Sequence, residues 1–354
     1  MLLRFFVLNL IILSSILCYS QIGGNNVYEF LNLPNSARAA SLGGNNISLN
    51  DNDLNFVYHN PSLLDSTMNN HLVLNYVNYF SDINYGYVAY AHHLKKYGTV
   101  AAGLHHINYG KFIEADETGV ISGNFYASDY ALNLYWSKPL DSAFTFGAEL
   151  KPIYSKYESY TSWGLALDAG ITYHSVKRKI AVAFVINNLG RQMKPYRPDN
   201  REPLPFEMQL GISKKIKHAP LRISLLLHNL ETYNLRYVNT NEVTQNTDPI
   251  SGDSITEKKF NIISDNLLRH TILGVEFLPF KNFFINFGYN YQRRKELQVS
   301  TRTALVGMSW GIGVKISKFN FSYGRASYHL AGASNHFSIT TNISDFYKKK
   351  TVEN

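Results

Sequence analysis

About fourteen short, aromatic-rich segments between residues 71 and 344 alternate apolar residues with small or polar ones. The segments 144–150 (FTFGAEL) and 319–324 (FNFSYG) show the pattern. Because successive side chains of a β-strand point to opposite faces, each segment predicts a strand with one apolar face. In a soluble sandwich that face would be the core, whereas in an exported chain the same alternation also fits lipid on one side and water on the other.

The first 20 residues have the features of a secretory signal peptide. Arg4 is followed by an apolar run from Phe5 to Leu17, and Cys18 and Ser20 place small residues before Gln21. We therefore predict cleavage before Gln21. A retained anchor and a lipoprotein are the weaker alternatives, because the apolar run is short for a membrane span and Leu17 stands where lipoprotein sites have Gly or Ala.

The remaining composition limits how an exported chain could enter a membrane. Cys18 is the only cysteine, so disulfides are excluded from the mature chain, and no later stretch approaches 18 unbroken apolar residues. A chain without such helices can cross lipid only as a closed barrel, since an open sheet edge would leave backbone groups unpaired. The 25 Tyr, 21 Phe and 3 Trp fit aromatic girdles at the two interfaces.

The lengths of the connections favour a transmembrane antiparallel β-barrel over residues 71–347. Even-numbered connections are short, whereas odd-numbered ones are mostly longer and polar, at 108–126, 155–161, 189–205, 231–268, 294–302 and 328–334. Outer-membrane barrels pair short periplasmic turns with long extracellular loops, so both termini are expected in the periplasm, including the basic tail 348–354. The predicted strands are 71–80, 84–93, 98–107, 127–137, 143–154, 162–174, 179–188, 206–216, 220–230, 269–279, 283–293, 303–316, 318–327 and 335–344.

Residues 21–70 differ from the rest and predict a compact, irregular hatch, or plug. The stretch 36–42 predicts a short helix capped by Asn35 or Ser36. Gly43 and Gly44 suit positive φ and a close approach to the barrel wall. Arg38 is expected to pair with a carboxylate of the lumen. These residues pack a plug in the favoured interpretation, and line a path for a ligand in the alternative.

Three segments resemble a known family: 28–44 (YEFLNLPNSARAASLGG), 51–55 (DNDLN) and 60–64 (NPSLL). They are similar to the mature N terminus of the PorQ family, outer-membrane proteins of the type IX secretion system of Bacteroidetes. The pattern is shared more widely with PorV, PorP and the fatty-acid transporter FadL, where it forms the hatch of a fourteen-stranded barrel. The resemblance covers about 45 residues, with Ser62 where relatives often have Ala. It implies a structural hatch motif made of Asn35, Ala37, Arg38, Gly43, Gly44, Asp53, Asn60 and Pro61.

The resemblance also implies a function without catalysis and without a cofactor. PorQ proteins belong to an attachment complex in which the peptidase PorU and the shuttle PorV join cargo to lipopolysaccharide, and they are thought to hold PorZ at the surface. The expected partners are therefore outer-membrane lipid, lipopolysaccharide and a PorZ-like protein with PorU and PorV. Export and the wide scatter of Lys and Arg argue against nucleic acid as the reason for the net charge of +8. The alternative is a FadL-like channel for small hydrophobic molecules.

Signals of catalysis or metal binding are weak. The match to G-x-S-x-G at 307–311 lies within a predicted strand with no helix after it, so Ser309 is not expected to be a nucleophile. The segment 51–55 imitates an EF-hand loop, but Phe56 replaces the required Gly. His92 should pair near residue 100 rather than with His105, so the two His-His pairs predict no metal site.

Two long loops are the candidate partner-binding surface. The connections 231–268 and 189–205 exceed what a barrel needs, and loops of such length are usually functional or disordered. Tyr and Arg dominate the energetics of many interfaces, and this favours five residues as anchors for a large exported partner. They are Arg197, Arg201, Tyr233, Arg236 and Tyr237. The alternative is a mobile surface loop with no partner.

Overall fold

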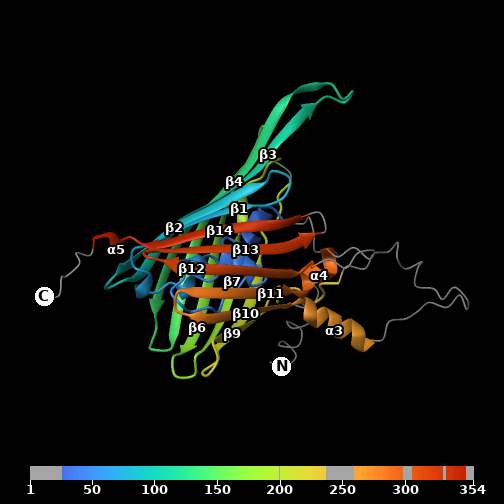
Figure 1. Ribbon diagram of the computed structural model, residues 1–354. Coiled ribbons are helices and arrows are strands. Elements are labelled where there is room, and N and C mark those ends of the chain that lie inside the picture. Colours follow the sequence, from blue (N-terminus) through green and yellow to red (C-terminus); the bar gives the residue numbers. More distant parts are fainter. Residues whose placement is uncertain (1–25, 199, 237–258, 298–304, 330–331, 348–354) are drawn as a thin grey trace, which may run out of the picture. The chain divides into compact units, whose positions relative to one another are not determined.

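The computed structural model describes residues 26–198, 200–236, 259–297, 305–329 and 332–347 (Figure 1). Fourteen antiparallel strands close into a barrel in which β1 pairs with both β2 and β14, confirming the predicted fold. The signal peptide, the basic tail 348–354 and Tyr237 lie outside the described residues. The strands are β1 (His71–Asn78), β2 (Asn84–Leu94), β3 (Gly98–Ala115), β4 (Ile121–Pro139), β5 (Phe144–Tyr157), β6 (Tyr160–Ser175), β7 (Ile180–Lys194), β8 (Glu207–Lys215), β9 (Leu221–Leu227), β10 (Thr271–Phe280), β11 (Phe283–Asn290), β12 (Met308–Ile316), β13 (Phe319–His329) and β14 (Gly332–Asn342).

The apolar face of the strands is the outer one. On β1, Leu74 and Tyr76 are about half exposed, whereas Val73, Asn75 and Val77 face inward and are buried. The same alternation recurs around the ring, with Leu, Ile, Phe and Trp outside. A barrel with an apolar outer surface and a lumen rich in Asn, Ser and His is the architecture of an outer-membrane protein. Among the described residues, no helix is both long and apolar enough to cross a membrane.

The connection predicted at 108–126 is instead a continuation of two strands. The pairing of β3 with β4 runs up to Ala115 opposite Ile121. Pairing of β2 with β3 ends at Asn108, and pairing of β5 with β4 ends at Ala127. The outer part of this hairpin, residues 109–126, therefore extends beyond both neighbouring strands (Figure 1). Phe112 stacks on Phe125 across it, with ring centroids 5.1 Å apart.

Three short helices occupy or follow connections of the barrel: α3 (Lys259–Arg269), α4 (Tyr291–Leu297) and α5 (Ser344–Tyr347). The sequence predicts a loop in place of α3, and a strand end followed by a loop in place of α4. The two helices meet at Asp265, which accepts a hydrogen bond of 2.8 Å from the Tyr291 hydroxyl and pairs with Arg269 at 2.9 Å. The connection 155–161 is only a tight turn, because β5 and β6 continue to Tyr157 and Tyr160.

The hatch, residues 26–70, fills the lumen with one α-helix and four 3₁₀ helices. They are η2 (Glu29–Asn32), α2 (Ala37–Ser41), η3 (Leu54–Tyr58), η4 (Pro61–Leu63) and η5 (Ser66–Met68). Helix α2 contacts β11 to β14, while η4 contacts β4, β5 and β6 on another part of the ring. The hatch is the blue segment within the ring of strands in Figure 1. The Ser36 side chain caps α2 by accepting a hydrogen bond from the Ala39 amide, so of the two predicted caps Ser36 is the one used.

Candidate functional site

Arg38 on α2 is the centre of a buried charge cluster that joins the hatch to the wall. Its guanidinium donates hydrogen bonds to Glu276 of β10 at 2.8 and 2.9 Å, and to Asp51 and Asp53 of the hatch. Arg222 of β9 pairs with Asp51 at 2.5 Å and with Glu276 at 3.0 Å. We call these five residues the Arg38 cluster. Its two guanidiniums face three carboxylates, and each carboxylate is hydrogen-bonded to at least one of them.

Burial of this cluster is compensated by its hydrogen bonds. The Glu276 side chain is only 1% exposed, and Arg38 also lies over the rings of Phe56 and Phe284. Burial opposes the ionised form of Asp51, but Arg38 and Arg222 outweigh it and hold the pKa of Asp51 well below its usual range. A buried pair of this kind is destabilising when one partner is missing, so the cluster fixes the position of α2 against β9 and β10.

The end of α2 is held by a second set of contacts. Gly43 and Gly44 both have positive φ, at 103° and 109°, and the Gly43 amide donates to Ser309 Oγ at 3.0 Å. Ser309 Oγ in turn donates to the Ser41 carbonyl at 3.0 Å. Ser309 is thus a lumen residue of β12 that binds the hatch backbone, and β12 continues as a strand after it. This position within a strand differs from the strand-turn-helix arrangement that a hydrolase nucleophile needs.

Glycines on the inner face of the wall allow the hatch to approach the strands closely. A Cβ atom at Gly147 would lie 2.3 Å from the Pro61 carbonyl carbon, and one at Gly324 would lie 2.2 Å from the Ala37 carbonyl oxygen. Side chains larger than hydrogen are excluded at such distances, so these glycines mark where another backbone passes. Gly288 also faces hatch backbone, whereas Gly170 and Gly311 face hatch side chains. We call the set the wall glycines, and its members come from five strands: Gly147, Gly170, Gly288, Gly311 and Gly324.

The remaining motif residues bind within the hatch and to the wall. Asn60 caps η4 by accepting from the Ser62 amide at 2.9 Å, and its Nδ2 donates to the Ile47 carbonyl at 2.7 Å and to Thr172 of β6 at 2.9 Å. Pro61 occupies the first turn of η4, where a missing N–H costs nothing. Asp53 caps η3, and Asn35 donates to the Asn55 carbonyl at 2.9 Å.

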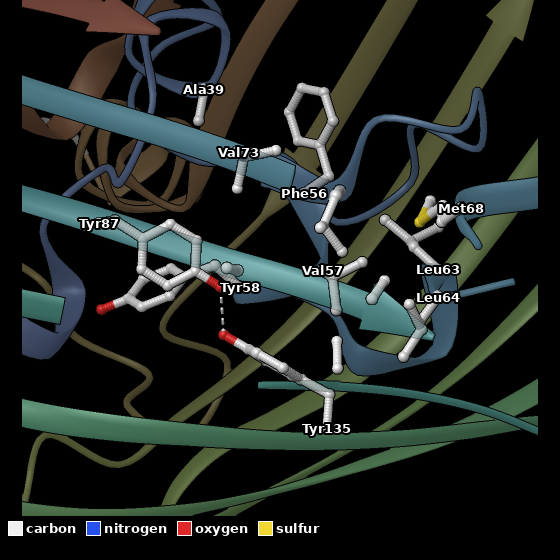
Figure 2. Packing of buried hydrophobic residues seen from close by; sticks show 14 of the residues in the cluster. Ala39, Phe56, Val57, Tyr58, Leu63, Leu64, Met68, Val73, Tyr87 and Tyr135 are labelled. Carbon is white, nitrogen blue, oxygen red and sulfur yellow. Dashed lines mark hydrogen bonds between the residues drawn. The ribbon is translucent and has the colours of Figure 1, made fainter. Parts of the chain in front are cut away.

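Apolar packing joins the hatch to the first strands of the barrel (Figure 2). Phe56, Val57, Leu63, Leu64 and Met68 of the hatch are buried against Val73, Tyr87 and Tyr135 of the wall. The hydroxyls of Tyr87 and Tyr135 are 2.8 Å apart, as the dashed line in Figure 2 shows. Tyr58 contacts the Tyr87 ring edge-on at 5.2 Å. The hatch therefore has a hydrophobic contact with β1, β2 and β4, which meets the Arg38 cluster only at Phe56.

A second buried charge group lies on the inner face of β5 and β6, and the sequence reasoning missed it. Lys151 Nζ donates to Asp168 at 2.5 Å and to Asn188 at 3.1 Å, and Glu149 lies 3.7 Å away. Burial, together with the positive charge of Lys151, lowers the pKa of the nearby hatch residue His59 to about 3. The sequence did contain a signal for this group: in the apolar–polar alternation of β5 and β6, the inward positions include Glu149, Lys151 and Asp168.

The predicted partner-binding residues that the structure describes lie in two connections, one after β7 and one after β9. Among the described residues, Arg197 lies over the Tyr160 ring at 5.8 Å and Arg201 donates to the Met193 carbonyl at 3.4 Å, and neither contacts Tyr233. Tyr233 is 80% exposed and follows β9, while Arg236 is partly buried. The loop 189–205 is shorter than predicted because β7 continues to Lys194.

Metal ligands do not gather in the part of the chain that the structure describes, where no group of three or more His, Cys, Asp or Glu side chains could hold an ion. His92 pairs with Val100 and His93 with Thr99, so the two His-His segments are not opposite one another, as the register argument predicts. His105 instead faces the hatch, where its Nδ1 lies 2.9 Å from the Tyr58 hydroxyl.

Solved structures share this fold at low sequence identity. The toluene transporter TbuX of Ralstonia pickettii aligns with a TM-score of 0.52 and 11% identity over 89% of this chain and 100% of its own. A mutant of the monoaromatic hydrocarbon channel TodX aligns with a TM-score of 0.51 and 11% identity over 86% of this chain and 96% of its own. A FadL homologue of Pseudomonas aeruginosa aligns with a TM-score of 0.46 and 10% identity over 87% of this chain and 98% of its own.

No family model and no curated protein matches the sequence. The likenesses to TbuX and TodX establish a common architecture, and substrates do not follow from architecture alone. The chain is therefore a fourteen-stranded barrel that shares its fold with TbuX and TodX and holds a hatch in its lumen.

Proposed function

We propose that this barrel is a noncatalytic anchor of the type IX secretion attachment complex. In this proposal it holds a PorZ-like protein at the cell surface, beside the PorU and PorV machinery that joins cargo to lipopolysaccharide. The observation that carries the proposal is the tight fit of the hatch. The wall glycines admit the hatch on five strands, and the Arg38 cluster and the apolar contact in Figure 2 hold it against other strands.

A lumen filled in this way favours a structural role over transport. A continuous path for a hydrophobic molecule needs an apolar lining, since burying a charge or an amide against such a ligand is unfavourable. The lumen side of β5 and β6 instead carries Glu149, Lys151 and Asp168, all 2% exposed or less. The hatch side carries Arg38 with Asp51.

The outer hairpin, residues 109–126, supplies a surface for the anchored partner. It lies at the end of the barrel that holds the long connections, which we place outside the cell. Ile113, Val120 and Ile121 are each more than 60% exposed on it, and its two edges lie beyond the neighbouring strands. Exposed apolar residues and unpaired strand edges are typical of sites that another chain covers.

The test is retention of the surface partner by cells that carry a shortened hairpin. Replacing residues 111–125 with Asn-Gly should release the PorZ-like protein into the medium. Barrel assembly should persist, because apart from the pair of Lys111 with Tyr126 the removed residues pair only with each other in the described structure. Deletion of 238–262, which falls largely outside the described residues, tests the other candidate loop in the same assay.

Controls separate loss of the partner from loss of the barrel. Thr118→Ser at the exposed turn is the matched control and should retain the partner. Heat-dependent migration in a detergent gel reports on assembly in every variant. Full retention of the PorZ-like protein by both shortened variants would contradict the anchoring function.

A FadL-like channel for small hydrophobic molecules is the second candidate. The shared fold with TbuX and TodX favours it, since those proteins are described as a toluene transporter and a monoaromatic hydrocarbon channel. Purification from outer membrane without crosslinker distinguishes the two functions. A large surface protein that co-purifies supports anchoring, whereas a fatty acid or detergent bound in the lumen supports transport.

A further inference from the structure

A pocket of about 280 Å³ opens at the loop end of the barrel, between the β5–β6 turn and the connection after β7. It is lined by three tyrosines and three polar residues: Tyr157, Tyr160, Tyr196, Arg197, Asn200 and Glu202. We propose that this pocket binds a short oligosaccharide. The proposal goes beyond partner anchoring, because it assigns a ligand class to residues outside the Arg38 cluster, the wall glycines and the apolar contact in Figure 2.

Two of the three tyrosines, Tyr157 and Tyr196, are held in place by a buried hydrogen-bond network. Asp129 of β4 is fully buried and accepts hydrogen bonds from Tyr157 at 2.9 Å and from Tyr109 at 2.7 Å. Ser155 links the same carboxylate to the Tyr196 hydroxyl. With their hydroxyl groups engaged in this network, Tyr157 and Tyr196 lie with ring centroids 5.2 Å apart at an angle of 40°. Their rings therefore form a fixed aromatic wall, which reduces the entropy lost when a ligand binds.

The rim of the pocket is polar. Arg197 lies over the ring of Tyr160, which is 43% exposed, and the described residues give its guanidinium no ion pair. Asn200 donates to Glu202 at 3.2 Å, which leaves one further carboxylate oxygen able to accept. The pocket thus offers donors and acceptors around aromatic faces, and it does so at the end of the barrel where loops are long.

This combination matches a sugar better than a hydrocarbon. A pyranose ring has an apolar face of C–H groups that packs on tyrosine, and hydroxyls at its edge that need both donors and acceptors. A purely apolar ligand would desolvate Arg197, Asn200 and Glu202 without replacing their hydrogen bonds with water. The volume lies just below the range of pockets for drug-sized ligands, so one or two sugar units are the expected occupant.

The experiment measures binding by the intact barrel in nanodiscs to an array of bacterial oligosaccharides. Tyr160→Ala and Arg197→Gln should each reduce binding at least tenfold, whereas Tyr160→Phe keeps the ring and should retain most of it. Tyr126→Ala removes a tyrosine that is 61% exposed on β4, outside the pocket, and is the matched control. Absence of any bound saccharide, or binding that Tyr160→Ala and Arg197→Gln leave unchanged, would overturn the proposal.

Two further measurements identify the source of the sugar and separate this site from anchoring. Saccharide released from lipopolysaccharide by mild acid and lipid-free capsular oligosaccharide are compared as ligands, and the one that binds names the source. Binding of intact lipopolysaccharide alone, unaffected by Tyr160→Ala, would indicate lipid contact and contradict a saccharide site. Retention of the PorZ-like protein is scored in the same variants, so loss of sugar binding with full retention leaves the anchoring function standing.

Discussion

Removal of the Arg38 side chain should release the hatch while leaving the barrel closed. Arg38 makes five hydrogen bonds to the three carboxylates of its cluster, and its side chain is 8% exposed. In Arg38→Met, three carboxylates would face Arg222 alone. Breaking a buried ion pair from one side destabilises by about 3–5 kcal/mol. That loss corresponds to a roughly 100- to 5,000-fold larger population of hatch displaced from the wall.

Hydrogen exchange measured by mass spectrometry in nanodiscs checks this magnitude region by region. Amides of residues 26–70 should exchange faster in Arg38→Met by the same factor, whereas amides of β1 to β14 should keep their protection. Arg38→Met combined with Glu276→Met should recover part of the loss, because replacing both partners with apolar groups removes the unpaired buried charge. Unchanged hatch exchange in Arg38→Met, or an equal loss of protection in the strands, would refute the argument that this cluster holds the hatch specifically.

Three other perturbations test the same interface. Gly147→Val should displace η4, because its Cβ would lie 2.3 Å from Pro61, and faster exchange of the hatch would report it. Gly119→Asn puts a side chain at a positive-φ turn with open space around it, far from the hatch in sequence, and should leave hatch exchange unchanged. Acid should loosen the hatch: His59 stays neutral in the folded state to about pH 3 but takes up a proton near pH 6.5 when exposed. Its contribution is therefore complete above pH 6.5 and is lost as pH falls toward 3, and His59→Gln should flatten that part of the exchange profile. Ser309→Ala should weaken hatch docking by about 0.5–1.5 kcal/mol, because the Ser41 carbonyl loses its donor while the Gly43 amide keeps its hydrogen bond of 3.3 Å to the Ala40 carbonyl. It should not alter lipid cleavage by purified membranes, and a loss of cleavage would revive the hydrolase interpretation.

The number and positions of the strands could be predicted from the sequence because the pattern that marks each strand is local. Period-2 alternation and the short even-numbered connections predict fourteen strands, and every one of them is present. The capped helix at Ala37–Ser41 is also a local pattern, since Ser36 reaches only to the Ala39 amide. Such features depend on neighbours within a few residues, which a single sequence displays directly.

The outer hairpin was missed because its alternation is interrupted. Gly110 has a φ of 88° and lies at a register shift between Asn108 and Lys111, so the strand pattern breaks where β3 leaves the wall. The acidic turn at Asp116 then looks like the middle of a polar loop. Helices α3 and α4 were missed for a related reason, because their contact at Asp265 joins segments on either side of two strands.

The contacts that decide between a plug and a path lie beyond local pattern altogether. Arg38 and Glu276 are 238 residues apart, and the sequence around either residue does not identify the other as its partner. From the sequence alone, the glycines of β5 and β13 could equally mark turns or ordinary strand positions. Only the hatch backbone packed against them shows why they are glycine.

The fold is shared with hydrocarbon transporters, and it raises the question of whether the hatch can move to let a ligand pass. A transporter must let its ligand pass the plug, so the plug must move or leave a gap at some modest free-energy cost. Here three sets of contacts hold one short segment: the Arg38 cluster, the wall glycines and the apolar contact around Tyr58. Moving the hatch would break a buried ion cluster and expose Phe56 and Leu63 together, and the first two losses are coupled because Arg38 lies over the Phe56 ring. The stability of the hatch, rather than the shape of the barrel, is therefore the property that separates an anchor from a channel in this chain.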